Sequence, residues 1–230
     1  MNYFRRFLDF LCPRHCVVCG KVLSPTEQPL CGVCLLHLPR TSFQFTPDDN
    51  AVAQLFWGQL PIEHAAAFFF YEPQSNTAQL VYQLKYNQRP DIGEDIGRIM
   101  AQEMQMAHFF DDIDVLLPVP LSRKRLRHRG YNQSEMLARG ISEITHLPID
   151  TRSVHREHFR KSQTTLSRQE RKENVEGLFQ LRHPERLEGH HVLLIDDVCT
   201  TGATLIACGK AIRHIPGIRI SILTLAYTKR

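Results

Sequence analysis

Short apolar runs alternate with amphipathic stretches along most of the chain. Runs of strand length lie at 64–72, 113–120, 191–196 and 218–228, and most of them are apolar throughout rather than at every second position. Strands of this type occur in parallel sheets that are covered by helices on both faces. The pattern therefore predicts an α/β fold with a central parallel sheet.

The amphipathic stretches between these runs place apolar residues at helical spacing. They predict helices over 77–86, 91–104, 132–144 and 202–215. Two short strands are also expected, over 148–154 and 175–181. Strands and helices that alternate in this order support the α/β assignment.

The N-terminal residues resemble neither a signal peptide nor a membrane span. The apolar positions Phe4, Phe7, Leu8 and Leu11 predict one face of a short helix, but Asp9 interrupts the run and no cleavage site follows. The longest apolar run has seven residues, 65–71, whereas a spanning helix needs about 20. We therefore expect a cytoplasmic protein without a membrane span.

Cysteines are concentrated near the N-terminus. Cys16 and Cys19 form one CxxC pair, and Cys31 and Cys34 form a second pair after eleven intervening residues. Two such pairs predict a structural zinc ion held by four thiolates. Disulfides are the alternative, which cytosolic reducing conditions disfavour. Cys12 is left over, and we expect it to pack in the N-terminal helix.

These patterns divide the chain into three parts. Residues 1–40 are expected to form the N-terminal helix and a small zinc module, and residues 61–230 the α/β domain. Residues 41–60 contain Pro47 and a run of acidic and polar residues, so they are expected to be a linker.

The stretch "VLLIDDVCTTGATL", residues 192–205, carries the strongest chemical signal. Asp196 and Asp197 follow a buried strand. The turn after them leads into a helix whose first N–H groups favour an anion. This turn contains Thr200, Thr201, Gly202, Ala203 and Thr204. Carboxylates beside such a turn suit a ribose 5-phosphate. The magnesium strand of an ATPase is an alternative, but the required GxxxxGK[ST] loop is missing.

The stretch resembles the phosphoribosyl pyrophosphate (PRPP) motif of type I phosphoribosyltransferases. The segments 116–142 and 161–179, with the CxxC pairs, resemble the ComF (competence protein F) family. The resemblance implies a type I phosphoribosyltransferase-like domain preceded by a four-cysteine zinc module. It also implies that Asp196 and Asp197 hold the ribose hydroxyls, that the turn 200–204 holds the 5′-phosphate, and that Mg²⁺ accompanies PRPP.

The resemblance also gives roles to two basic tracts. A pyrophosphate loop is expected at Val119, Pro120, Leu121, Ser122 and Arg123, and further basic residues follow up to Arg129. A flap over PRPP is expected within 155–174, with Lys161, Arg168, Arg171 and Lys172 as candidates. A solvated basic surface is the alternative for the first tract, and spacing alone does not choose among the candidates in the second.

Two functions follow from the resemblance. The first is a cytoplasmic competence factor that supports DNA uptake in natural transformation, with a PRPP-type site, and with single-stranded DNA and proteins of the uptake machinery as partners. The alternative is an active phosphoribosyltransferase that moves ribose 5-phosphate from PRPP to an unknown acceptor. The motif contains no general base and no acceptor pocket, so PRPP binding is favoured over transfer. An acceptor site would have to lie on 60–95 or on the zinc module.

Overall fold

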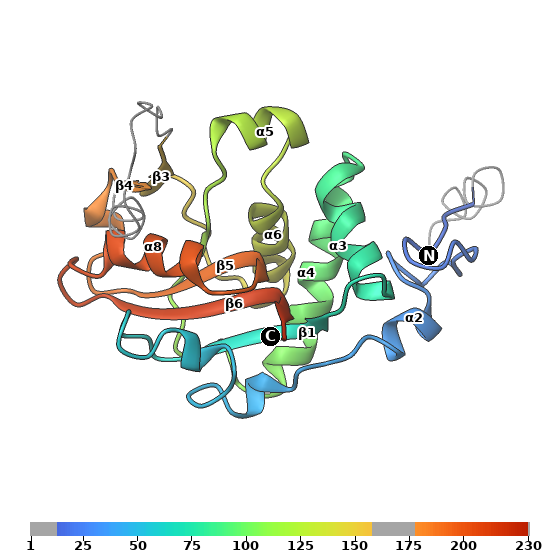
Figure 1. Cartoon of the computed structure of the whole chain (residues 1–230), viewed down its shortest axis with the longest axis horizontal. Coiled ribbons are helices and arrows are strands. Elements are labelled where there is room, and N and C mark those ends of the chain that lie inside the picture. Colours follow the sequence, from blue (N-terminus) through green and yellow to red (C-terminus); the bar gives the residue numbers. More distant parts are fainter. Residues whose placement is uncertain (1–12, 158–177, 230) are drawn as a thin grey trace, which may run out of the picture.

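A central sheet of four parallel strands organises the chain (Figure 1). The computed structural model describes residues 13–157 and 178–229. The strands, in the spatial order β1-β6-β5-β2, are β1 (Ala65–Tyr71), β6 (Arg219–Thr228), β5 (His191–Cys199) and β2 (Val115–Pro118). The predicted parallel sheet is therefore confirmed. β5 is longer than expected and includes both aspartates.

Helices cover both faces of the sheet. One hydrophobic cluster contains residues of α3 (Asn76–Tyr86), α4 (Pro90–Gln105) and α6 (Gln133–Thr145), and the other contains residues of α8 (Ala203–Ile212). These four helices confirm the predicted ones. None of the helices in the described part of the chain is long and apolar enough to cross a membrane.

The sequence pattern missed helix α5 (Arg123–Arg129). Its sequence, RKRLRHR, has no buried residue, so no apolar periodicity marks it. The helix begins at Ser122, whose side-chain oxygen accepts a hydrogen bond from the Arg125 N–H at 3.4 Å. It ends at Gly130, which has a φ of 81°, a conformation that glycine adopts without strain.

A second, antiparallel sheet pairs β3 (Val154–Arg156) with β4 (Phe179–Leu181). The expected strand over 148–154 is formed only at two positions, because Ile149 makes a single bridge to Leu116 and Val154 begins β3. The Asp150 carboxylate accepts hydrogen bonds from the N–H groups of Arg152 and Ser153, both at 2.8 Å. This turn at Asp150 directs the backbone away from the central sheet after Ile149.

The segment 41–60, expected to be a linker, packs against the sheet. It contains the 3₁₀ turns Phe43–Phe45 and Ala53–Leu55. Val52 and Phe56 are fully buried in the same cluster as α8. The Asn50 side chain donates to the Ala65 carbonyl at 2.7 Å and accepts from the Val52 N–H at 2.9 Å. The segment thus covers part of one sheet face.

The predicted zinc module, residues 1–40, is described from residue 13; this part lies at one end of the molecule and contains α2 (Gly32–Leu36) (Figure 1). Its buried Leu30 belongs to the same hydrophobic cluster as α3, α4 and α6. At its C-terminal end, the Arg40 guanidinium lies 4.3 Å above the Phe68 ring, and its Nη2 is 2.5 Å from Glu103 Oε1. These contacts attach the module to the α/β domain.

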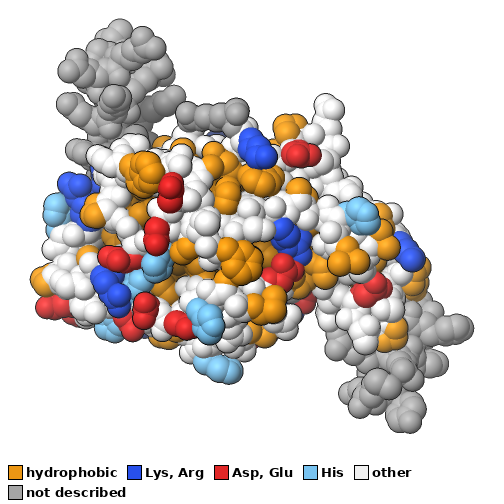
Figure 2. Space-filling model, turned by 90° about the horizontal axis from the view of Figure 1, so that it is seen from below, with side chains coloured by type: hydrophobic (Ala, Val, Ile, Leu, Met, Phe, Trp, Pro, Cys, Tyr) orange, Lys and Arg blue, Asp and Glu red, His pale blue; other side chains and the backbone are white. Residues whose placement is uncertain are grey.

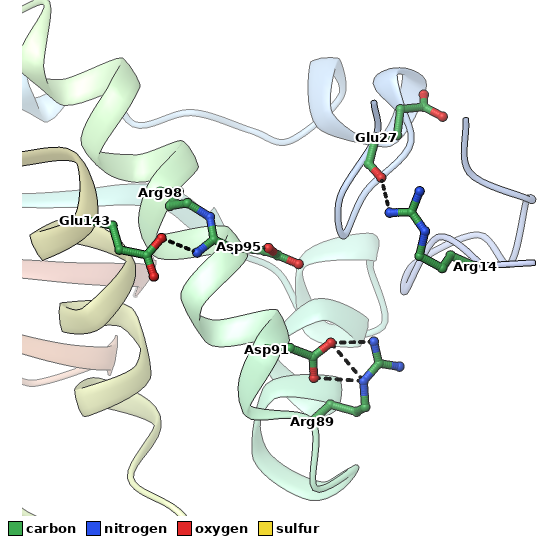
Figure 3. Close-up of polar contacts among 7 residues, drawn as sticks. All are labelled: Arg14, Glu27, Arg89, Asp91, Asp95, Arg98 and Glu143. Carbon is green, nitrogen blue, oxygen red and sulfur yellow. Dashed lines mark hydrogen bonds and ion pairs between the residues drawn. The ribbon is translucent and has the colours of Figure 1, made fainter. Parts of the chain in front are cut away.

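Helices α4 and α6 touch through glycines. A Cβ atom on Gly140 would lie 2.0 Å from the Glu94 carbonyl oxygen, and one on Gly97 would lie 2.3 Å from the Leu137 carbonyl oxygen. Beside this contact, Arg98 Nη1 of α4 bonds Glu143 Oε2 of α6 at 2.6 Å (Figure 3). The two helices are therefore held at backbone contact distance around Gly140, in the C-terminal half of α6.

Candidate functional site

The acid pair lies on β5 just beyond the end of its neighbour β2. The last residues paired between these strands are Pro118 and Ile195. The chain leaves β5 into α8 on one face of the sheet, and it leaves β2 towards α6 on the other face. Ligands of open α/β sheets bind where neighbouring connections diverge in this way.

Asp196 is held by α6 and by its neighbour in the chain. Its Oδ1 accepts hydrogen bonds from Ser134 Oγ at 3.0 Å and from the Asp197 N–H at 2.9 Å. Burial raises the pKa of the Asp196 carboxyl to about 7, and the negative charge of Asp197 acts in the same direction. The Asp196 carboxyl therefore titrates near neutral pH.

Asp197 faces two cations. Its Oδ2 is 3.2 Å from Lys85 Nζ of α3 and 3.9 Å from Arg129 Nη1 of α5. Arg129 is only 12% exposed and also donates to Gln133 Oε1 at 2.7 Å. These cations balance a half-buried carboxylate that would otherwise be costly beside Asp196.

The threonine-rich turn lies next to the acid pair. Gly202 has a φ of 73° and caps α8. A small cavity of about 50 Å³ is bounded by the turn and by Asp196. The predicted residues that form its wall are Thr200, Thr201, Gly202, Ala203 and Thr204. The structure thus brings the predicted anion turn and the first aspartate together.

A larger cavity of about 230 Å³ opens over the acid pair. Both aspartates line it, together with Thr200 and Thr204. Four basic side chains also line it: Lys85, Arg125, Arg129 and Arg156. With four cations and two carboxylates, the cavity favours an anion.

The expected pyrophosphate loop is divided between neighbouring cavities. Val119 and Leu121 line the cavity over the acid pair, and the Val119 N–H donates to the Ile195 carbonyl at 2.9 Å. Pro120, Leu121 and Arg123 line an adjacent cavity of about 500 Å³. Ser122 caps α5. The flap candidates Lys161, Arg168, Arg171 and Lys172 lie outside the described residues.

Sequence reasoning missed two residues that line this site or bond the acid pair, Lys85 and Ser134, and it placed Arg129 and Arg156 only within basic tracts. Burial lowers the pKa of Arg156, and the positive charge of Arg125 adds to the effect. Lys85 and Ser134 are separated from the aspartates by 112 and 62 positions, which no local pattern relates. Arg129 stood in a recognised basic tract, and only its place at the end of α5 distinguishes it.

The four predicted zinc ligands form a cluster. The Sγ atoms of Cys16, Cys19, Cys31 and Cys34 all lie within 4.8 Å of one another. Those of Cys19 and Cys31 are 3.7 Å apart, and a tetrahedron with Zn–S bonds of about 2.3 Å has edges of about 3.8 Å. The residues therefore fit a structural zinc ion.

Hydrogen bonds shape the loop between the two cysteine pairs. The Glu27 carboxylate accepts from the N–H groups of Ser24 at 2.8 Å and Gly32 at 2.6 Å. Arg14 Nη1 donates to the Glu27 carbonyl at 3.1 Å (Figure 3). Burial raises the pKa of the Cys16 thiol, but backbone N–H groups, chiefly that of Cys19, outweigh this and lower it to about 7. Cys12 lies outside the described residues.

Comparison with known proteins adds relatives named for DNA use and competence. The chain is 29% identical to the DNA utilization protein YhgH of Escherichia coli strain K12 over 198 residues, which cover 83% of this chain and 80% of that protein. It is 28% identical to competence protein F of Haemophilus influenzae, covering 64% and 66%. It is 36% identical to competence protein ComFC of Bacillus subtilis, covering 40% and 35%.

Among solved structures, the chain is similar to the B. subtilis glutamine PRPP amidotransferase, with a TM-score of 0.42 and 19% identity. The match covers 62% of this chain and 30% of that chain. Residues 83–230 match the family model described as the phosphoribosyl transferase domain. This match spans more than half of the chain and includes the whole acid pair and threonine turn, so the chain belongs to the phosphoribosyl transferase domain family.

Proposed function

We propose that the chain binds PRPP together with Mg²⁺ over the acid pair, and that it serves DNA uptake or DNA use in the cytoplasm. The observation that supports the binding half is one cavity: the acid pair, two threonines of the anion turn and four basic side chains all line it. A ribose with a phosphate at one end and a pyrophosphate at the other needs these three kinds of partner.

In this proposal, each group on the ligand has its own partners. Asp196 and Asp197 accept hydrogen bonds from the ribose hydroxyls, and the turn 200–204 donates N–H groups and hydroxyls to the 5′-phosphate. Lys85, Arg125 and Arg129 lie close enough to the same cavity to offset the pyrophosphate charge. Mg²⁺ prefers carboxylate and phosphate oxygens, and it would neutralise part of that charge.

The biological half of the proposal rests on the relatives, whose printed names are DNA utilization protein and competence protein. α5 supplies exposed basic side chains that would suit a DNA backbone. The face seen in Figure 2 instead mixes basic, acidic, histidine and hydrophobic side chains, so its described residues form no continuous basic surface there. Proteins of the uptake machinery are the other proposed partners.

Transfer of the ribose 5-phosphate is the second candidate function. In that reaction the bond from C1 to the pyrophosphate oxygen breaks, a bond from C1 to an acceptor atom forms, and the acceptor gives up a proton as Mg²⁺-bound pyrophosphate leaves. The observation that favours it is a second cavity of about 600 Å³ that adjoins the first.

Calorimetric titration of Mg²⁺–PRPP into the full chain tests the binding proposal. We expect one site per chain, no comparable heat when EDTA replaces Mg²⁺, and weaker binding of ribose 5-phosphate, which lacks the pyrophosphate. The proposal is wrong if saturating Mg²⁺–PRPP produces neither heat nor a rise in melting temperature, because a ligand that binds the native state must stabilise it.

We also propose that the cysteine cluster binds one structural zinc ion. The Cys16→Ser/Cys34→Ser double variant is expected to lose its zinc equivalent and to become sensitive to proteases between residues 13 and 38, because such small modules fold around their metal. Elemental analysis and limited proteolysis measure both effects. Cys208→Ala, which alters a thiol buried in α8, is the control and should keep its zinc. Equal metal content in all three proteins would contradict the assignment.

A further inference from the structure

Three consecutive polar residues at the start of α6 are almost fully buried. Asn132, Gln133 and Ser134 are 9%, 1% and 1% exposed. Asn132 Nδ2 donates a hydrogen bond to the Val119 carbonyl at 3.1 Å. Ser134 Oγ donates to Asp196 Oδ1 at 3.0 Å. Two of the three residues therefore have an evident role, because they tie α6 to the expected pyrophosphate loop and to the acid pair.

Gln133 uses only one end of its side-chain amide. Its Oε1 accepts a hydrogen bond from Arg129 Nη1 at 2.7 Å. Its Nε2 is buried and has no hydrogen-bond partner in the described part of the chain. A buried donor without a partner destabilises the fold, and an apolar side chain of similar size would avoid that cost. Stability alone therefore does not explain a glutamine at this position, and the bond to Arg129 is the contact that distinguishes it.

Arg129 keeps most of its positive charge unpaired. Within the described residues, the only carboxylate within 4.0 Å of its guanidinium is that of Asp197, whose Oδ2 is 3.9 Å from Nη1. The same oxygen is 3.2 Å from Lys85 Nζ, so Lys85 takes the larger share of the Asp197 charge. The Arg129 side chain is 12% exposed and lines the cavity over the acid pair. Its charge is thus available to an anion in that cavity.

The turn between α5 and α6 fixes the backbone on which this contact depends. Gly130 ends α5 with a φ of 81°, and Tyr131 Oη donates to the Leu84 carbonyl at 2.6 Å. The start of α6 is held by the bonds of its polar side chains described above. Loss of the Arg129–Gln133 bond should therefore change the orientation of the guanidinium rather than the course of the turn.

We propose that Gln133 is a positioning residue for the pyrophosphate end of the ligand. It holds Arg129 over the cavity through a neutral acceptor, so the guanidinium keeps both its place and its charge. A carboxylate at position 133 would hold the same group but would neutralise it. The inference rests on the proposed function, in which Arg129 offsets the pyrophosphate charge. It implies that Gln133 affects ligands that contain a pyrophosphate group and does not affect ribose 5-phosphate.

Calorimetric titration of the full-length protein with three probes tests this role: Mg²⁺–PRPP, Mg²⁺–pyrophosphate and ribose 5-phosphate. Gln133→Met keeps the length of the side chain and removes the acceptor. We expect it to bind the two pyrophosphate-containing probes about tenfold more weakly, as weakening of one charge-assisted hydrogen bond predicts. Ribose 5-phosphate should bind within about twofold of its native affinity. Gln133→Glu, which keeps the acceptor but neutralises Arg129, should show the same selective loss, and it carries the comparison if Gln133→Met does not fold.

Two controls separate positioning from a general effect of the substitution. In an Arg129→Met background, Gln133→Met and Gln133→Glu should weaken binding no further, because the residue acts through Arg129. Additive losses in that background would overturn the proposal. Gln102→Glu adds the same negative charge at an exposed position of α4, and its affinities for all three probes should match those of the native protein.

The three probes also distinguish this proposal from the proposed function. Native affinity of Gln133→Met for both pyrophosphate-containing probes, or an equal loss for ribose 5-phosphate, would overturn the role of Gln133. A native protein that binds Mg²⁺–pyrophosphate but not Mg²⁺–PRPP would refute the proposed function, and a selective loss in Gln133→Met would still support the positioning role. A native protein that binds neither probe would refute both.

Discussion

Replacing Asp196 and Asp197 together with asparagine is expected to weaken Mg²⁺–PRPP binding at least about 100-fold. Above pH 7, where Asp196 is ionised, two charged acceptors are lost, and each charge-assisted hydrogen bond contributes about 1.5–3 kcal/mol. The adjacent acids Asp111 and Asp112, both exposed, provide a matched control: Asp111→Asn/Asp112→Asn makes the same change of charge away from the cavity. Calorimetry measures both variants, and equal affinities would remove the acid pair from the site.

The single variant Asp196→Asn should change how the stability of the fold depends on pH. The folded-state pKa of about 7 exceeds the usual carboxyl value of 3.8, so the native state holds an extra proton between these values. The contribution of Asp196 to the free energy of unfolding is therefore fully present below about pH 4. It is lost as the pH rises through 7. We expect Asp196→Asn to raise the melting temperature at pH 8 and to flatten its decline between pH 5 and pH 8. An unchanged pH profile would contradict the raised pKa.

Gly140→Ala is expected to lower the free energy of unfolding much more than Gly32→Ala, which adds the same methyl group elsewhere. The new Cβ would lie 2.0 Å from the Glu94 carbonyl oxygen and 2.8 Å from the Arg98 nitrogen. Both are backbone atoms of α4, so the helices must separate. Overpacking of this kind costs about 3 kcal/mol, which corresponds to about 6–12 °C in melting temperature for a chain of this size.

Urea denaturation and thermal melting measure this effect. Gly32→Ala is the matched control, because its new Cβ would meet only the Glu27 carboxylate, at 3.5 Å, and its stability should change by less than about 0.5 kcal/mol. A Gly140→Ala protein as stable as the native one would show that α4 and α6 are not in backbone contact. Because Ser134 of α6 bonds Asp196, the variant should also bind Mg²⁺–PRPP more weakly.

Sequence periodicity predicted the parts of the fold in which burial follows a regular pattern. The apolar runs became β1, β2, β5 and β6, and the amphipathic stretches became α3, α4, α6 and α8. Periodicity failed for segments whose structure is set by caps, turns or irregular packing rather than by a regular pattern of burial. α5 is defined by its caps rather than by an apolar face, and β3 starts late because Asp150 bonds the following backbone. The segment 41–60 has turn-like composition, yet Phe56 is fully buried.

Sequence reasoning predicted only those residues of the site that are neighbours in the sequence. The acid pair and the threonine turn adjoin in sequence, so one motif contained both. Lys85, Ser134 and Arg156 reach them from three other elements, and the distances that matter exist only after folding.

Lys85 links the binding equilibria of the two neighbouring cavities. It pairs with Asp197 and lines both cavities. A ligand that changes the position of this ammonium group changes the charge that a second ligand meets. Occupancy of the two cavities is then cooperative, and each ligand alters the affinity of the other by the same factor. Lys85 would make the protein report on the joint presence of two ligands rather than on either one.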